Sequence, residues 1–188
     1  MTRESVVGDR RRRQSAPLRA DGGHVGTRFD RVAPTDAEGE FDHRPSRAAV
    51  LAFFEDRFGI DPAVFEDYTF WERGKGTIWA FRGDLNSPVD IEGLGMVVLR
   101  ADQEHWKPTT SAAQQFGWAA ADCVIHLEDR PARRFLAGED QALDWDGDWG
   151  YLIVTHDIDG DSEPIGVGLY VHGELRSQMP TGRQRDLR

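Results

Sequence analysis

Apolar residues first recur at helical spacing in the stretch PSRAAVLAFFEDRFGIDP, residues 45–62. The apolar side chains that share one helical face are Val50, Leu51, Phe54 and Phe58. Ser46 is a residue type that caps helix N-termini, and Gly59 is suited to end a helix. The Asp-Pro pair that follows is suited to open another helical turn. The pattern therefore predicts one amphipathic helix and a second, short one.

Residues 1–45 show no such periodicity and are rich in Gly, Pro, Asp and Arg. A segment of this kind buries too little apolar surface to offset the loss of chain entropy on folding. We therefore expect a disordered tail. Its run from Arg10 to Arg13 is either an arm that contacts nucleic acid or a solvated linker with a chance cluster, and both interpretations stay open.

Aromatic and β-branched residues dominate the middle of the chain. The stretch YTFWERGKGTIWAFRGD, residues 68–84, carries them on both sides of Gly74-Lys75-Gly76, which is typical of a hairpin. GLGMVVLRAD, residues 93–102, predicts a buried strand. A helix is then expected directly after the Pro-Thr-Thr sequence, because Ser111 and Gln114 form a capping-box pattern.

The last third of the chain is rich in predicted strands. CVIHLED, residues 123–129, predicts a strand, and RPARRFLAGED, residues 130–140, a short helix that Gly138 ends. Residues 149–180 alternate β-rich runs with Asp-Gly and His-Gly turns, which is typical of a compact antiparallel meander or small barrel.

The predicted fold class is α+β, with a helix-plus-antiparallel-sheet domain followed by a small β-barrel. The domain boundary is placed near Arg130, where helix-containing sequence gives way to β-rich sequence. The predicted organisation is a disordered tail over 1–45, an α+β domain over 46–130, a β-barrel over 131–183 and a C-terminal tail over 184–188.

Charge and composition indicate where the protein works. The net charge is −10, the acids are mostly aspartate, there are only two lysines, and Cys123 is the single cysteine. This composition is typical of a salt-adapted, haloarchaeal, cytoplasmic protein whose acidic surface serves solubility. No stretch approaches the roughly 20 apolar residues of a membrane span, and the first residues lack a signal-peptide core, so no membrane association is expected.

Several kinds of chemistry are not supported by the sequence. Two aspartate clusters, from Asp144 and from Asp157, lack the glycine and glutamate that an EF-hand loop requires at its sixth and twelfth positions. Cys123 and His126 have no partners to complete a zinc site. No nucleophile elbow and no dinucleotide-binding glycine motif is present. We therefore expect no catalytic residue, no metal and no cofactor.

Three strings carry a resemblance to a known family: LGMVVLR with HWKPTTSAAQQFGWAAADCVIHL, ARRFLAGED, and WGYLIVTHDIDGDSEPIGVGLYVHGELRSQMPTGR. Together they resemble the pre-PUA plus PUA module of archaeal relatives of Sun-type RNA cytosine-5 methyltransferases, and small two-domain ribosome-assembly factors. The methyltransferase domain and its catalytic cysteine motif are absent from this sequence. The resemblance implies a non-catalytic RNA-binding protein of rRNA or tRNA maturation or modification, with an RNA methyltransferase or a pre-ribosomal particle as a further partner. We expect the protein to be a monomer.

The resemblance also implies the RNA-binding surface, formed by the short helix, the glycine loop after it and the last strand. The residues that match these elements are Arg133, Arg134, Gly138, Arg176, Ser177, Gln178 and Arg183. All four arginines of residues 136–188 lie in the last thirteen positions, a polarity that solubility does not require. Because the Debye length is roughly 3 Å in molar salt, binding there must rest on direct contacts, which favours Arg176 and Arg183.

The sequence HWKPTT holds one of the two lysines. Lys107, Thr109 and Thr110 are predicted to hold an anion at the start of the following helix. The alternative is that Thr110 or Ser111 only caps this helix while Lys107 pairs with an acid such as Glu104.

Four tryptophans are candidates for stacking on bases: Trp106, Trp118, Trp145 and Trp149. We expect Trp118 to lie in a core and leave Trp145 and Trp149 open. A different class of function also stays open, a protein-interaction adaptor that docks a methyltransferase or ribosomal protein without touching RNA. An apolar, charge-poor patch would favour the adaptor over an arginine-bearing face.

Overall fold

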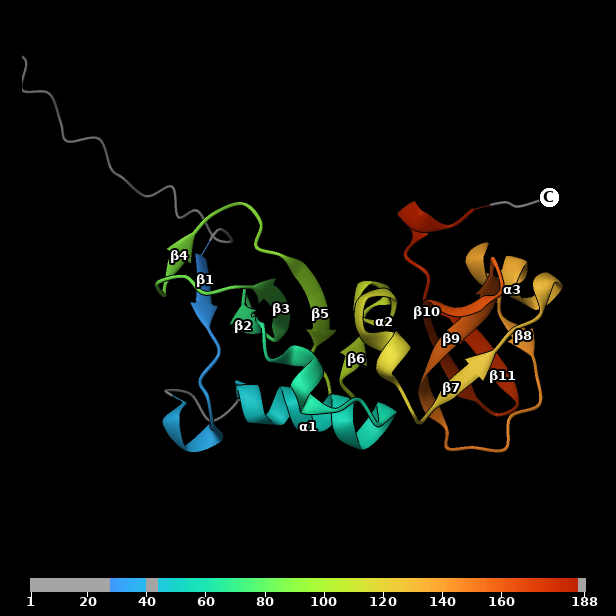
Figure 1. The fold of residues 1–188 in the computed structure, drawn as a ribbon, viewed down its shortest axis with the longest axis horizontal. Coiled ribbons are helices and arrows are strands. Elements are labelled where there is room, and N and C mark those ends of the chain that lie inside the picture. Colours follow the sequence, from blue (N-terminus) through green and yellow to red (C-terminus); the bar gives the residue numbers. More distant parts are fainter. Residues whose placement is uncertain (1–27, 40–43, 186–188) are drawn as a thin grey trace, which may run out of the picture.

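The computed structural model describes residues 28–39 and 44–185. They form two β-sheets at opposite ends of an elongated molecule, with helix α2 (Thr110–Phe116) between them (Figure 1). The arrangement is α+β, as the sequence predicts.

The first sheet has six strands in the order β4-β1-β2-β3-β5-β6, and all of its pairs are antiparallel. Its strands are β1 (Arg28–Arg31), β2 (Tyr68–Glu72), β3 (Thr77–Arg82), β4 (Val89–Asp90), β5 (Met96–Arg100) and β6 (Lys107–Pro108). Strands β2 and β3 form the hairpin predicted around Lys75, and β5 is the predicted buried strand.

Helix α1 (Arg47–Phe58) runs alongside this sheet with the predicted ends. The Ser46 hydroxyl accepts a hydrogen bond from the Ala49 N–H (3.1 Å), and Gly59 ends the helix in the left-handed conformation at φ +62°. The short helices of this half are η1 (Asp36–Glu38) and η2 (Pro62–Phe65). The predicted second helix is therefore η2.

The second sheet has five strands in the order β7-β9-β10-β11-β8. Its strands are β7 (Val124–His126), β8 (Gln141–Ala142), β9 (Gly150–Ile158), β10 (Asp161–Val171) and β11 (Glu174–Ser177). The pair β7/β9 is parallel and the others are antiparallel. The remaining helices are η3 (Gly117–Ala119), α3 (Asp129–Leu136) and η4 (Thr181–Arg183).

Helix α2 joins the two halves through buried contacts. Its residues Ala112, Ala113 and Phe116 share one hydrophobic cluster with Ile153 and Val167 of the second sheet. The Gln114 side chain of the same helix donates to the Ile165 carbonyl oxygen (3.2 Å). The seam between the halves is thus a packed interface with its own core.

Two predicted boundaries are wrong. Strand β1 and helix η1 lie inside the predicted disordered tail, and Phe29 of β1 is fully buried against Trp71. Strand β1 itself contains a single apolar residue, which gives no periodicity, so the sequence does not reveal this strand. Residues 1–27, 40–43 and 186–188 of the predicted tails, with the arginine run, lie outside the described residues. The boundary near Arg130 also moves earlier, because β7 already belongs to the second sheet.

Candidate nucleic-acid interface

The end of α3, the loop after it and the end of β11 meet on one surface. The Ser177 hydroxyl donates to the Phe135 carbonyl oxygen (2.8 Å), and the Ser177 N–H donates to the Asp140 carboxylate (3.1 Å). Gly138 has φ +85°, and a Cβ at this position would lie 2.4 Å from the Gln184 amide nitrogen. The structure therefore brings the predicted residues of α3, the glycine loop and β11 together, beside the segment that contains Arg183.

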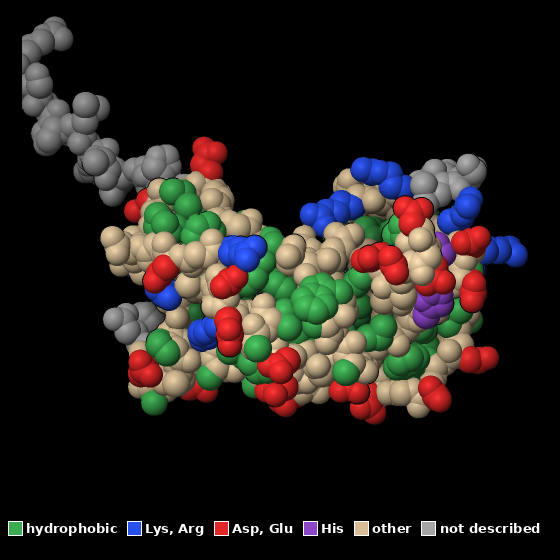
Figure 2. Space-filling model, viewed as in Figure 1, with side chains coloured by type: hydrophobic (Ala, Val, Ile, Leu, Met, Phe, Trp, Pro, Cys, Tyr) green, Lys and Arg blue, Asp and Glu red, His purple; other side chains and the backbone are tan. Residues whose placement is uncertain are grey.

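The cations of this surface differ in their partners. Arg134 pairs with Glu139 (2.9 Å) and Arg176 with Glu174 (2.8 Å). Arg183 is exposed in η4, and within the described residues no carboxylate lies at ion-pair distance from it. Figure 2 shows Lys and Arg side chains along the upper edge of this half, whereas Asp and Glu dominate its lower edge. Arg183 is thus a cation that is available for a phosphate.

Lys107 lies at the seam between the two sheets. Its ammonium donates to the side-chain oxygen of Gln178, which follows β11. Partial burial, and then the charge of Arg100, lower the pKa of Lys107 below its ordinary value. The alternative pairing with Glu104 is not formed, and no carboxylate of the described chain pairs with Lys107. Two residues predicted separately, Lys107 and Gln178, are therefore in direct contact.

Of the two threonines beside Lys107, Thr109 has a structural role and Thr110 is buried. Thr109 is the N-cap of α2: its hydroxyl accepts from the Ala112 N–H (3.1 Å) and donates to the Val97 carbonyl oxygen (2.6 Å). The capping box predicted at Ser111 and Gln114 is therefore wrong. Thr110 is 3% exposed, so its predicted contact with an anion is also wrong. Helix α2 has only seven residues, and the Thr109 hydroxyl already takes the Ala112 N–H at its start.

Arg100 is a residue that the sequence interpretation missed. It is exposed at the end of β5, directly opposite Lys107 of β6 and Thr77 of β3. Residues directly opposite in antiparallel strands present their side chains on the same face. The alternation of apolar and polar residues could have marked Arg100 as exposed, but the register that puts it beside Lys107 requires the fold.

The exposure of the tryptophans differs from the prediction. Trp118 is 68% exposed, so its expected place in a core is wrong. It lies in η3, where its indole N–H donates to the Gln115 carbonyl oxygen (3.1 Å). Trp145 packs against the core of the second sheet, whereas Trp149 is 57% exposed and meets the ring of His172 edge-on. Trp118 and Trp149 are therefore the tryptophans best placed to stack on a base.

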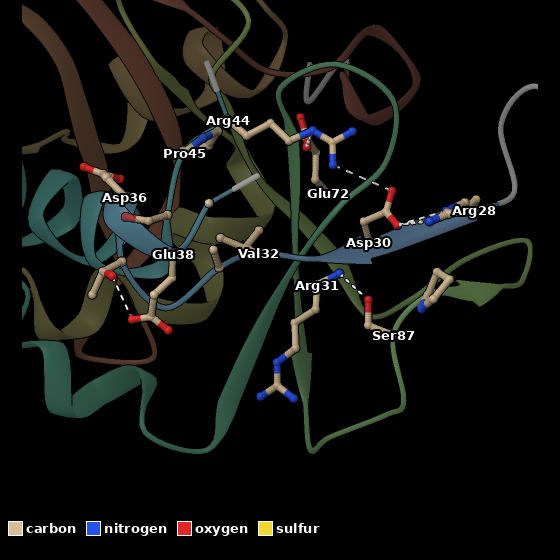
Figure 3. A pocket seen from close by; sticks show the side chains of 15 residues that line it. Arg28, Asp30, Arg31, Val32, Asp36, Glu38, Arg44, Pro45, Glu72 and Ser87 are labelled. Carbon is tan, nitrogen blue, oxygen red and sulfur yellow. Dashed lines mark hydrogen bonds and ion pairs between the residues drawn. The ribbon is translucent and has the colours of Figure 1, made fainter. Parts of the chain in front are cut away.

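A pocket of about 340 Å³ lies at the other end of the molecule, beside β1 (Figure 3). The buried carboxylate of Glu72 pairs with Arg44 (2.9 Å) and accepts from the Gly76 N–H (2.7 Å). Asp30 pairs with Arg28 (2.9 Å) and lies 3.8 Å from Arg44. Because these charges already satisfy one another, the pocket anchors β1 and leaves little unpaired charge for a ligand.

Two further structural findings concern other kinds of site. Among residues 28–39 and 44–185, no three His, Cys, Asp or Glu side chains are grouped so that they could share a metal ion. No helix in the same part of the chain is both long and apolar enough to cross a membrane.

Two known families match parts of the chain. Residues 18–95 match a family of unknown function (DUF7122), and residues 123–185 match the PUA domain of the methyltransferase RsmF. No curated protein matches the chain. The pre-PUA resemblance of the first half stays a prediction, and the start of the second match agrees with the structural boundary before β7. The chain therefore carries a PUA-type domain over residues 123–185, preceded by a domain from a family of unknown function.

Proposed function

We propose that this protein is a non-catalytic RNA-binding protein that acts in rRNA or tRNA maturation or modification. The observation that carries the proposal is the PUA match over residues 123–185, which contains the surface formed by α3, the glycine loop and β11. The absence of a catalytic cysteine motif from the sequence supports a binding role without chemistry. An RNA methyltransferase or a pre-ribosomal particle is the further partner that fits this role.

Arg183 and Arg176 provide the test. We expect Arg183→Ala to weaken binding of fluorescently labelled bulk tRNA or fragmented rRNA by about tenfold, since each lost phosphate contact removes an ion pair and a released counterion. Arg176→Ala has a smaller effect because Glu174 already neutralises this arginine. Arg82→Ala, in an ion pair of the first sheet, is the control and leaves binding unchanged.

Crosslinking in cells identifies the RNA. We expect one rRNA or tRNA site to be enriched with the wild-type protein and lost with the Arg176/Arg183 double variant. Unchanged affinity of the double variant for every RNA, with wild-type thermal stability, would remove this surface as the binding site.

The adaptor remains a second candidate because the structure contains an apolar cleft of about 870 Å³ between α1 and the strands β9 and β10. The apolar residues that line it are Ala49, Ala52, Phe53, Trp106, Trp149, Tyr151, Leu169 and Val171. Arg57 in this cleft donates to the Tyr151 carbonyl oxygen (3.0 Å). Two exposed acids, Asp56 and Glu104, also line the cleft. An apolar segment of a partner protein flanked by Lys or Arg fits this cleft.

Two alanines of α1 test the second candidate. Ala52 lines the cleft, whereas Ala48 is exposed on the same helix and is not part of the lining. We expect a selection from a helical peptide library to enrich apolar peptides with basic flanks, and Ala52→Arg to weaken their binding while Ala48→Arg does not. Enrichment of acidic peptides, or equal loss in both variants, would exclude this docking mode.

A further inference from the structure

A row of hydrogen-bond donors crosses the seam between the two halves. Thr77 of β3 lies opposite Arg100 of β5, and Arg100 lies opposite Lys107 of β6. Side chains at directly opposed positions share one face of a sheet, with Cβ atoms about 5 Å apart. Lys107 then reaches Gln178 of the PUA-type domain. A hydroxyl, a guanidinium, an ammonium and an amide therefore follow one another along this edge.

The charge of this row is uncompensated. Like charges on directly opposed strand positions destabilise a sheet, and the proximity of Arg100 contributes to the lowered pKa of Lys107. Among the described residues, no carboxylate pairs with Arg100 or with Lys107, although the chain holds 33 acids. Six other arginines of the described chain do have a carboxylate partner: Arg28, Arg31, Arg44, Arg82, Arg134 and Arg176.

An anion would relieve this repulsion, and the row has free donors for one. A lysine ammonium has three N–H groups, of which Gln178 takes one, and a guanidinium has five. The side chain of Arg100 makes no hydrogen bond and no ion pair with any other described residue. Its fork is therefore open to two oxygens of one phosphate.

We propose that Thr77, Arg100, Lys107 and Gln178 bind a backbone phosphate of RNA, so that the RNA contact extends from the PUA-type domain across the seam onto the first sheet. The proposal rests on the RNA-binding function proposed above. It adds the first sheet to the binding surface. Thr77 lies within residues 18–95, which match a family of unknown function, and Arg100 and Lys107 follow that segment. The conformation in which α2 holds the two halves together is then the one that binds RNA.

Arg100→Gln is the decisive variant because this side chain has no structural partner in the described chain. With labelled bulk tRNA and fragmented rRNA as probes, we expect about tenfold weaker binding and a slope of log K against log salt that is smaller by about one. Arg100→Lys retains the charge and recovers most of the affinity. Arg82→Gln, at the other end of β3, is the matched control and has no effect.

Gln178→Met separates a phosphate contact from a contact between domains. This variant removes the partner of Lys107 and leaves both cations, so we expect a loss of less than about threefold, since it removes no phosphate ion pair. If Gln178→Met matched the loss in Lys107→Gln while Arg100→Gln had no effect, Lys107 would act by holding the domains together and the phosphate site would be excluded.

The outcomes also separate this site from the proposed function. Weaker binding in Arg183→Ala, with unchanged affinity and salt slope in Arg100→Gln and Lys107→Gln, would overturn the phosphate site and leave the RNA-binding function standing. No binding of either RNA by the wild-type protein would overturn both.

Discussion

Two regions of the molecule carry closely spaced cations, and they differ in whether those cations have carboxylate partners among the described residues. Beside β1, Arg44 pairs with Glu72 and Arg28 with Asp30. At the seam, Arg100 and Lys107 stand on opposed strands without a carboxylate partner in the described chain. The first region is a pocket whose charges hold the protein together (Figure 3). The second is an open edge whose charges repel each other.

The difference shows how a binding site is to be sought in an acidic protein. With 33 acids against 23 lysines and arginines, a cation of such a chain often has a carboxylate within reach, as six of the described arginines do. The number of cations in a region therefore says little about anion binding. A pair of adjacent cations that has no acid partner is more informative, because it raises the free energy of the folded state unless a ligand relieves it.

The largest effect on stability is expected in the pocket. Glu72→Ala leaves the buried N–H of Gly76 without an acceptor and Arg44 without its partner. We expect a loss of about 2–3 kcal/mol in the free energy of unfolding, measured by urea denaturation. RNA affinity of the folded protein stays unchanged. A loss below about 0.5 kcal/mol, the range of an ordinary surface substitution, would show that this carboxylate does not anchor the strand.

Arg100→Glu gives Lys107 a carboxylate partner, as the arginines of the pocket have. We expect the stability of the protein to rise and its RNA affinity to fall. The new carboxylate opposite Lys107 stabilises the sheet by about 0.5 kcal/mol, as cross-strand pairs of opposite charge do. The same carboxylate repels phosphate, so RNA affinity falls by about 100-fold. Parallel thermal melts and binding titrations check both. If stability falls together with affinity, the substitution has damaged the fold and the comparison fails.

The sequence was sufficient for elements with a strong local signal. Ser46 and Gly59 define the ends of α1, and the glycines around Lys75 define the β2/β3 hairpin. It was insufficient where long-range pairing decides. Strand β1 is held by its partners on both sides, and Phe29 alone gives no period that could reveal it.

The candidate site shows the same division. Arg176, Ser177 and Gly138 were predicted from the resemblance, and the hydrogen bonds of Ser177 show that their elements lie together. The local sequence pattern predicted an exposed Thr110 that contacts an anion. The N-cap of α2 is instead Thr109, and the side chain of Thr110 points into the interior. The role proposed for Arg100 could not be predicted from the sequence, because it depends on the register between β5 and β6 and on the lack of an ion pair with any described carboxylate.

A smaller effect on RNA affinity is expected when the acid partner of an arginine is removed from the surface formed by α3, the glycine loop and β11. Glu174→Gln removes the carboxylate that neutralises Arg176. If the ion pair with Glu174 keeps Arg176 from binding phosphate, RNA affinity rises by about threefold at low salt. The gain is modest because the side chains of Arg176 and Glu174 are exposed and their charges are screened. Asp67→Asn frees Arg82 far from this surface in the same way and is the control. An equal gain in both variants would indicate only a general effect of net charge.

The finest test uses the scarcity of lysine. Because the chain has only Lys75 and Lys107, reductive methylation with ¹³C gives two lysine side-chain signals, and Lys107→Arg assigns them. Burial and Arg100 hold the pKa of Lys107 below 10.5, so the folded protein binds fewer protons than the unfolded chain between the lowered pKa and 10.5. The contribution of Lys107 to stability therefore increases as the pH rises through that window.

A bound phosphate reverses this effect on Lys107. The phosphate favours the charged ammonium, so the pKa of Lys107 rises when tRNA is added. RNA affinity therefore falls as the pH rises past the pKa that Lys107 has without RNA. Without RNA, Arg100→Gln also raises the pKa of Lys107. It reverses only the smaller part of the shift, because burial is the larger cause. A Lys107 signal that titrates identically with and without saturating RNA would show that no phosphate reaches the ammonium, whatever the affinity of the variants.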